Sequence, residues 1–122
     1  MNAYHPHAYA RTDAPLRCER SVEYDVFARV TRALTAAPSQ RDTAFASYVR
    51  ALHDNQRLWT ALAADLSQPN NALPDQLKAQ LLSLYRFTMQ HTPKALKKEA
   101  GLDVLIEINT SVMRGLRGGP AA

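Results

Sequence analysis

The sequence has too few cysteines and glycines, and too short apolar runs, for several common classes of protein. Its 122 residues include one cysteine, four glycines and one tryptophan. The lone Cys18 has no partner for an internal disulfide, which fits a reducing compartment. No apolar run approaches the roughly 20 residues that cross a bilayer, and residues 1–14 lack the apolar segment of a secretory signal. We therefore expect a cytoplasmic protein without membrane insertion.

Residue patterns that carry catalysis or hold metals are also missing. His53 and Asp54 are adjacent in a helical pattern, so their side chains point about 100° apart and do not face each other. His5, His7 and His53 have no conventional zinc spacing with each other, and His5 with His7 would hold a metal only loosely, because two ligands make no structural site. Gly115 and the glycines after it follow a helical pattern rather than opening one, which excludes a phosphate-binding loop. We expect no enzyme, no cofactor and no metal site.

The charge balance is mildly basic and does not indicate a nucleic-acid footprint. The chain has 15 basic and 11 acidic residues, for a formal net charge of +4. The densest basic group, Lys94 to Lys98, is followed at once by Glu99, which is typical of a solvated helix face. A helix-turn-helix protein is the best structured alternative, because Asn109 and Arg114 could face DNA. Acidic residues lie along the same segment, so direct nucleic-acid binding is not expected.

The residues that are present repeat with a helical period, and no segment alternates with period two. The sequence predicts an all-α fold: a single domain, 1–122, built as a small orthogonal or up-down bundle. It would have four main helices, a short extra helix, an N-terminal arm at 1–19 and a flexible C-terminal tail at 115–122. The predicted helices cover about 20–37, a start at Ser39 or Asp42 through 66, 74–91, the short helix 93–98, and 102–116.

Prolines, glycine and capping residues set the predicted boundaries. Ser21 is a plausible N-cap for the first helix, and Pro38 is expected to end it, because the residue before a proline is pushed out of the α region. Thr92 and Pro93 together resemble a cap followed by proline in the first turn, which predicts a separate short helix. Gly101 is expected to separate that helix from the last one.

Polar residues interrupt two of the apolar stripes. Leu52–Leu66 has the strongest helical period and holds Trp59, with Asn55 between its apolar positions. Asn109 occupies a similar position in the last predicted helix. A buried asparagine needs hydrogen-bond partners. Two interpretations stay open: both asparagines are satisfied inside the bundle, or one faces an apolar groove and bonds a partner helix.

Several segments resemble the FlaF family of flagellar biosynthesis regulators, in the family's order and with similar spacing. Each segment alone is a weak signal, and the ordered set is fairly specific. The segments are Met1–Tyr4, Tyr24–Phe27, His53–Trp59 through Asp65–Leu66, Asn71–Pro74 and Leu105–Leu116.

That resemblance implies a non-enzymatic cytoplasmic protein that supports flagellin production and export. Family members act opposite FlbT, a repressor of flagellin translation, and are thought to bind flagellin as a secretion chaperone. FlbT is a second candidate partner. The alternative is a post-transcriptional regulator that acts through RNA or FlbT without stable flagellin binding. With helix-in-groove docking in mind, the predicted partner-binding residues are Asn55, Trp59, Asn109, Met113 and Arg114.

Met113 would adapt to varied partner side chains. For Trp59 the competing interpretation is a plain core residue. Arg114 is the charged member of the family-like segment.

Overall fold

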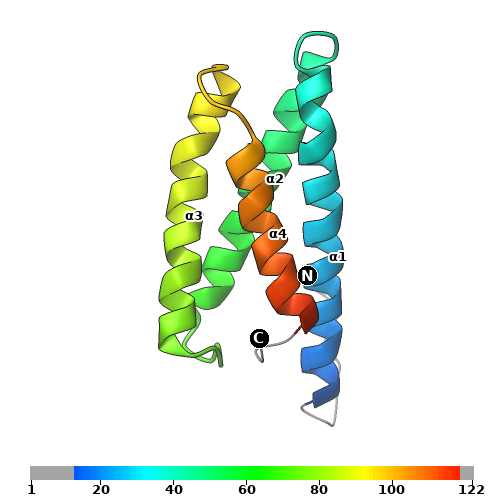
Figure 1. The fold of residues 1–122 in the computed structure, drawn as a ribbon. Coiled ribbons are helices and arrows are strands. Elements are labelled where there is room, and N and C mark those ends of the chain that lie inside the picture. The colour runs from blue at the N-terminus through cyan, green and yellow to red at the C-terminus, as the bar shows by residue number, and fades with distance from the viewer. Residues whose placement is uncertain (1–12, 119–122) are drawn as a thin grey trace.

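The computed structural model describes the backbone of residues 13–118 and the side chains of residues 24–116. This part of the chain contains four α-helices and one short 3-10 helix and no strand (Figure 1). The elements are α1 (Asp13–Ala36), η1 (Ala37–Gln40), α2 (Phe45–Leu66), α3 (Asp75–Leu96) and α4 (Asp103–Gly118). The predicted all-α bundle of four main helices is confirmed.

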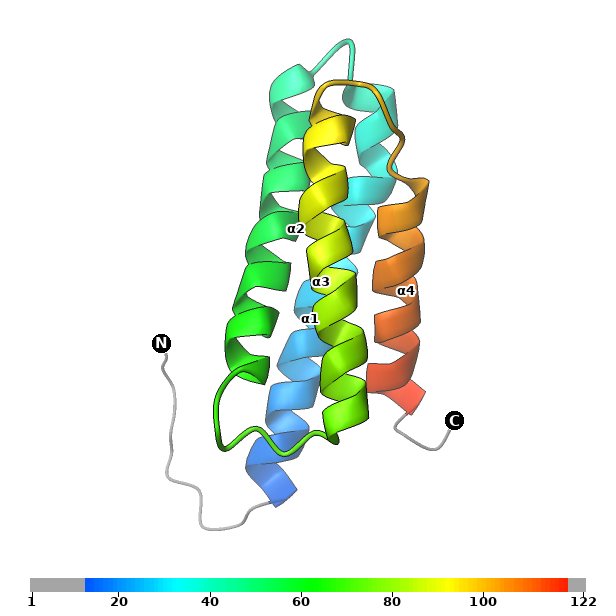
Figure 2. The ribbon, with the colours of Figure 1, turned by 90° about the vertical axis from the view of Figure 1, so that its left-hand side faces the viewer.

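Successive helices run up and down, joined at alternate ends of the molecule (Figure 1). α1 packs against both α2 and α4, and α3 packs against α2, whereas α3 and α4 are not a closely packed pair. Figure 2 shows α3 and α4 as separate ribbons along the length of the bundle. Of the two predicted arrangements, the chain therefore adopts the up-down one. One side of the bundle, between α3 and α4, is less tightly joined than the others.

The first helix begins earlier than its sequence pattern predicts. The prediction was a start near residue 20 with Ser21 as the cap, but α1 begins at Asp13 and Ser21 lies inside it. Pro15 is compatible with this start, because the first backbone N–H groups of a helix have no intrahelical acceptor to lose. The predicted N-terminal arm therefore shortens: residues 13–19 are helical, and residues 1–12 lie outside the described part of the chain.

The connection between α1 and α2 is a 3-10 turn without a side-chain cap. Pro38 ends α1 as predicted, at Ala36, and lies within η1. α2 begins at Phe45 after Ala44, so neither Ser39 nor Asp42 caps it. The Ser39 hydroxyl instead donates to the Ala36 carbonyl at 2.9 Å.

The predicted separate helix at 93–98 is wrong, because α3 continues through Pro93 to Leu96. A proline inside a helix loses one backbone hydrogen bond and crowds the preceding turn. Here Thr92 and Ala95, on either side of it in sequence, are both fully buried, so packing keeps the segment helical.

The end of α3 is a Schellman motif in which a lysine takes the position usually held by glycine. Lys98 has φ of 65°, its N–H donates to the Ala95 carbonyl at 3.0 Å, and Glu99 N–H donates to Lys94 O at 2.8 Å. The chain therefore turns at Lys98, three residues before the predicted break at Gly101. At its C-terminal end α4 extends to Gly118, so residues 115–118 of the predicted tail at 115–122 are helical.

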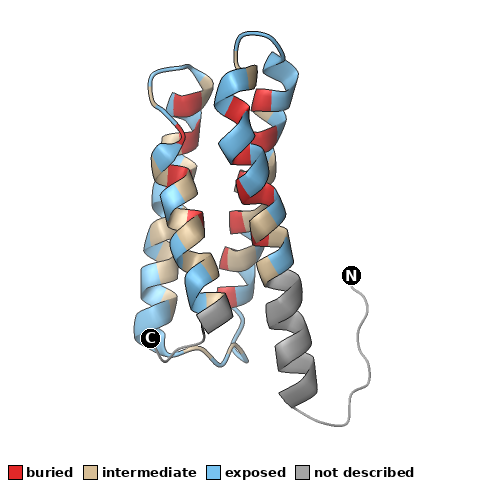
Figure 3. Cartoon of the chain, turned by 45° about the vertical axis from the view of Figure 1, so that its right-hand side comes forward, coloured by how far each residue is buried: buried red, intermediate tan, exposed pale blue. Residues whose placement is uncertain are grey.

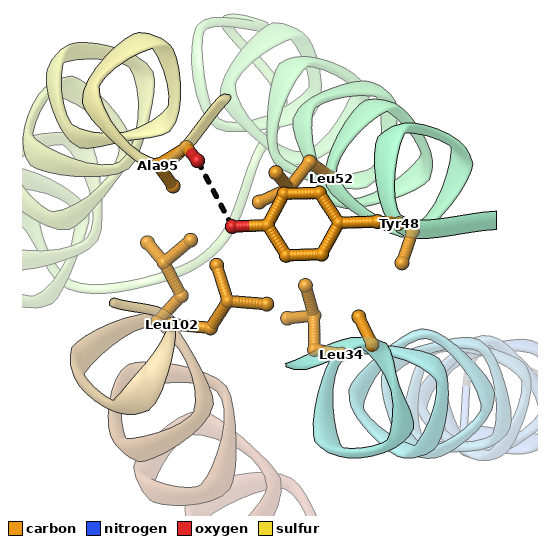
Figure 4. Packing of buried hydrophobic residues seen from close by; sticks show 8 residues of the cluster. Leu34, Tyr48, Leu52, Ala95 and Leu102 are labelled. Atoms are coloured by element: carbon orange, nitrogen blue, oxygen red, sulfur yellow. Dashed lines mark hydrogen bonds between the residues drawn. The ribbon is translucent and has the colours of Figure 1, made fainter. Parts of the chain in front are cut away.

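A cluster of buried apolar side chains lies at the end of the bundle that carries η1 and the α3–α4 loop. Tyr48 lies among Leu34, Leu52 and Leu102, and its hydroxyl donates to the Ala95 carbonyl at 2.9 Å (Figure 4). In α3 and α4 the buried positions are concentrated toward this end, while lower positions are partly or fully exposed (Figure 3). We call this end of the bundle, with Tyr48 at its centre, the closed end.

Candidate functional site

A chain of hydrogen bonds between buried side chains joins α2 to α4. The Trp59 indole N–H donates to Asn109 Oδ1 at 2.9 Å, and Asn109 Nδ2 donates to Asn55 Oδ1 at 2.9 Å. All three side chains are 0% exposed. Phe27 of α1 packs edge-on against Trp59, with ring centroids 5.8 Å apart. We call Asn55, Trp59 and Asn109 the polar layer.

The polar layer fits the interpretation in which the asparagines bond inside the bundle. Each asparagine has a partner inside the bundle, and the side chains of Asn55, Trp59 and Asn109 have no surface that a partner could touch in this conformation. The interpretation of Trp59 as a core residue also fits this burial. Of the five predicted partner-binding residues, only Met113 and Arg114 reach the surface, half-buried and exposed respectively. Partner contact by any of the five stays a prediction.

Two buried polar atoms in and beside the polar layer have no hydrogen-bond partner within residues 24–116. Asn55 Nδ2 and the Thr88 hydroxyl are buried and have no hydrogen-bond partner among the described residues. Tyr48 bonds Ala95 across the antiparallel α2–α3 pair, and about two turns further along both helices lie Asn55 and Thr88. The two atoms therefore occupy the same level of the bundle. Leaving such groups unpaired costs about 1–3 kcal/mol each.

Two buried threonines of α3 were not predicted as core residues: Thr92 was predicted to cap a separate helix, and Thr88 was given no role of its own. Both threonines are fully buried, and the Thr92 hydroxyl donates to the Thr88 carbonyl at 2.7 Å. Their spacing of one helical turn on a stripe otherwise filled by leucine was the available signal. The Thr92 hydroxyl is therefore satisfied on its own helix, which makes this threonine compatible with a core position.

Below the polar layer, the inward-facing stripe of α3 is incompletely covered. Thr88 and Ala95 are 0% exposed, whereas Leu77, which lies on the same stripe, is 38% exposed. Leu84 is partly exposed, and on α4 the same holds for Val112 and Leu116. We call this end of the bundle, with the 67–74 loop, the open end.

One flank of α3 extends this incompletely covered area toward α4. Phe87 is 41% exposed and stacks on His91, with ring centroids 5.4 Å apart. His91 Nε2 lies 2.8 Å from the Gly101 carbonyl, just before α4, so this flank faces the α3–α4 side. Partly exposed apolar residues therefore gather on one side of the open end. We call them the α3–α4 apolar surface: Leu77, Leu84 and Phe87 of α3 with Ile108, Val112 and Leu116 of α4.

The described residues offer no constellation for catalysis or metal binding. Within residues 24–116, no group of three or more His, Cys, Asp or Glu side chains could hold a metal ion. None of the helices in the described part is long and apolar enough to cross a bilayer. His5 and His7, the loose metal pair considered from the sequence, lie outside the described residues. The notable features are therefore a buried polar layer and an apolar surface.

Comparison with known protein families decides the affiliation. The chain matches the family described as flagellar protein FlaF over residues 5–116. The chain belongs to the FlaF family. No curated protein and no solved structure matches it. The FlaF match covers α2, α3 and nearly all of α4, so the polar layer and the α3–α4 apolar surface both lie within the family domain. This makes the chain a flagellar protein.

The segments that carry the resemblance to FlaF contribute the polar layer. His53–Trp59 in α2 supplies Asn55 and Trp59, and Leu105–Leu116 in α4 supplies Asn109. These two segments are far apart in sequence and are joined in the structure by the hydrogen bonds of Asn109. In this FlaF-family chain, residues from two of the resembling segments therefore join α4 to α2.

Proposed function

We propose that this protein binds flagellin in the cytoplasm as a secretion chaperone and so promotes flagellin synthesis and export. The observation that carries the proposal is the α3–α4 apolar surface, in which inward-facing residues such as Leu77 are left partly exposed. Membership of a flagellar protein family supports the choice of flagellin as the partner. An export chaperone covers amphipathic helices of its cargo and releases them, which is the task that helix-in-groove docking performs.

The energetics of such docking depend on both partners. Burying a fully exposed Leu, Val or Phe side chain contributes about 1.5–3 kcal/mol, but the six side chains of this surface have at most 41% of their area left to bury. Most of the roughly 8 kcal/mol of a micromolar complex would therefore come from the apolar stripe of the partner helix. A helix laid between α3 and α4 would complete the burial of six partly covered side chains, after the ordering costs of association. Arg114, exposed on α4, and Met113, half-buried one residue earlier, lie on the same lower half of that helix. Met113 would adapt to partner side chains at the edge of this surface. Arg114 is two positions from Val112 and so about 200° around α4; it would bind a part of the partner that extends past the groove onto the neighbouring face of α4.

The test is co-expression with flagellin followed by size-exclusion chromatography of the purified mixture. We expect the two proteins to co-elute, and clean separation at tens of micromolar would instead favour regulation through RNA or FlbT without flagellin binding. The variant Leu77→Ala with Phe87→Ala should weaken binding at least about tenfold while changing the melting temperature little, because both side chains are substantially exposed. His53→Ala with Thr60→Ala, both exposed on α2 and outside the α3–α4 apolar surface, is the matched control.

Arg114→Glu and Asn109→Ala separate recognition from folding. Arg114 is exposed, so its reversal should lower flagellin affinity with an unchanged melting temperature. Asn109 is buried and hydrogen-bonded, so its loss should lower the melting temperature first. If both variants lose flagellin binding only when their melting temperature also falls, Arg114 has a structural role and is not part of the docking surface.

A further inference from the structure

The flank of α3 opposite Phe87 carries a second strip of incompletely covered apolar side chains. Successive helical residues are about 100° apart, so Met89, two positions from Phe87, lies on the far side of α3. Leu82, Tyr85 and Met89 are all partly exposed there, along the junction with α2. This strip is separate from the α3–α4 apolar surface. It lies on the α2–α3 side of the molecule.

Basic side chains lie on the two helices that form this junction. Arg57 of α2 and Arg86 of α3 are exposed, and Lys78 of α3 is half-buried. The register set by the Tyr48–Ala95 hydrogen bond places Arg57 and Arg86 at one level, about one heptad below Arg50 and Pro93.

These basic groups have no acidic partners of their own. The ion pairs among the described residues involve only Arg41, Lys98 and Asp42, at the closed end. Arg86 Nη2 donates weakly to Ser83 Oγ at 3.5 Å. Asp75, at the N-terminal end of α3, is the only carboxylate of that helix. The positive charge beside the strip is therefore available to an incoming anion.

We propose that this α2–α3 surface binds an amphipathic helix whose apolar stripe is flanked by carboxylates. The apolar strip accepts the stripe, with Met89 adapting its shape to the partner side chains. The guanidinium groups of Arg57 and Arg86 bind carboxylates with forked hydrogen bonds. A partly exposed apolar strip favours a protein helix over a nucleic acid, because a phosphate backbone gives it no apolar group to bury.

This surface is independent of the proposed flagellin site. Leu82, Tyr85 and Met89 occupy one flank of α3, and Phe87 and His91 the other, so two helices could bind at once. An acidic partner on α2–α3 would leave the α3–α4 apolar surface free for cargo. Charge reversal at Arg57 and Arg86 should therefore leave co-elution with flagellin unchanged. If the unmodified chain does not bind flagellin, the proposed function is refuted and this second proposal is untouched.

The probe is a pair of designed helical peptides of roughly 18 residues, about five turns. Both carry leucines at every third or fourth position, one has glutamates on both flanks, and the other has glutamines in their place. Binding is measured by fluorescence anisotropy with the full chain. We expect the glutamate peptide to bind at least about tenfold more tightly at low salt, with the preference shrinking as salt is raised.

Variants locate the site. Arg57→Glu with Arg86→Glu should abolish the preference for the glutamate peptide, whereas Arg29→Glu with Arg32→Glu, exposed on α1, makes the same charge change and should retain it. Three results would overturn the proposal. They are equal affinity for the two peptides, no binding at about 100 µM, which is weaker than any useful recognition, and a preference that survives Arg57→Glu with Arg86→Glu. Poly(U) RNA that binds more tightly than the glutamate peptide and displaces it would overturn it as well. The salt titration of the unmodified chain tests the proposal even if a variant misfolds.

Discussion

The two ends of this bundle use the same kind of helical stripe with different results. At the closed end Leu102 and Leu105 are 3% and 0% exposed, and Tyr48 bonds the last turn of α3. At the open end Leu77 keeps 38% of its surface exposed. The difference follows from packing partners: α2 and α1 cover the upper stripes, while α3 and α4 do not pack closely on each other. Buried apolar side chains are therefore concentrated at the closed end, and the inward-facing stripe of α3 keeps apolar surface exposed at the open end.

The largest test of this comparison is a pair of leucine truncations. Leu102→Ala removes a buried side chain and should lower the free energy of unfolding by about 2–5 kcal/mol. Leu77→Ala should lower it by about 1 kcal/mol or less, because much of that side chain is already in water. Chemical denaturation of both variants measures the difference. Equal losses would contradict the distinction between the two ends.

The second test concerns the polar layer between the ends. Asn109→Ala leaves the Trp59 indole N–H and Asn55 Oδ1 without their partner, so stability should fall by about 2–4 kcal/mol. Thr110→Ala is the control on the same helix, because that hydroxyl bonds only the Ile106 carbonyl and is partly exposed. Denaturation followed by tryptophan fluorescence reports on Trp59 directly. An unchanged midpoint for Asn109→Ala would show that these hydrogen bonds contribute nothing.

A smaller effect is expected at the closed end from Tyr48→Phe. The change keeps the ring among its apolar neighbours and removes only the hydroxyl that donates to Ala95. The free energy of unfolding should fall by about 0.5–1.5 kcal/mol, the net contribution of one hydrogen bond. Amide hydrogen exchange near Ala95 should speed up more than exchange near Leu77. Uniform acceleration along α3 would mean that the bond does not hold this end.

The smallest effects compare backbone substitutions at the two ends. Gly115→Ala meets no atom within 4 Å, so it should raise stability by about 1 kcal/mol through helix propensity. Lys98→Gly relieves a left-handed backbone but loses the Asp42 ion pair and the contact over the Phe45 ring. These terms are each about 1 kcal/mol or less and oppose one another. Thermal melting should therefore rise for the first variant and change little for the second.

Much of the fold could be predicted because helical period and proline positions are local properties. α2 and α4 were predicted to end or begin within a few residues of their observed bounds. Two local signals misled: Pro93 resembles a helix start, and Ser21 resembles a cap. In both places another contribution to helix stability outweighs the local signal. At Pro93, the burial of Thr92 and Ala95 outweighs one missing hydrogen bond, and upstream of Ser21, Pro15 occupies a turn where no bond is lost.

The candidate site was predictable only in part. The sequence placed Asn55 and Asn109 on apolar stripes and required partners for them, but a partner on another helix depends on packing angles that no local pattern contains. The α3–α4 apolar surface was not predictable for the same reason. Leu77 and Thr88 belong to one stripe, and the period does not say which half a neighbouring helix will cover.

The sequence by itself determined that this chain is helical, where most helices lie, and which side chains share a face, because these properties follow from the spacing of residues along the chain. It also carried the resemblance to the FlaF family. Only the tertiary structure decided that Asn109 bonds both Asn55 and Trp59, and that α3 and α4 are not a closely packed pair. Distances between helices depend on how whole surfaces interlock, which is a property of the folded molecule.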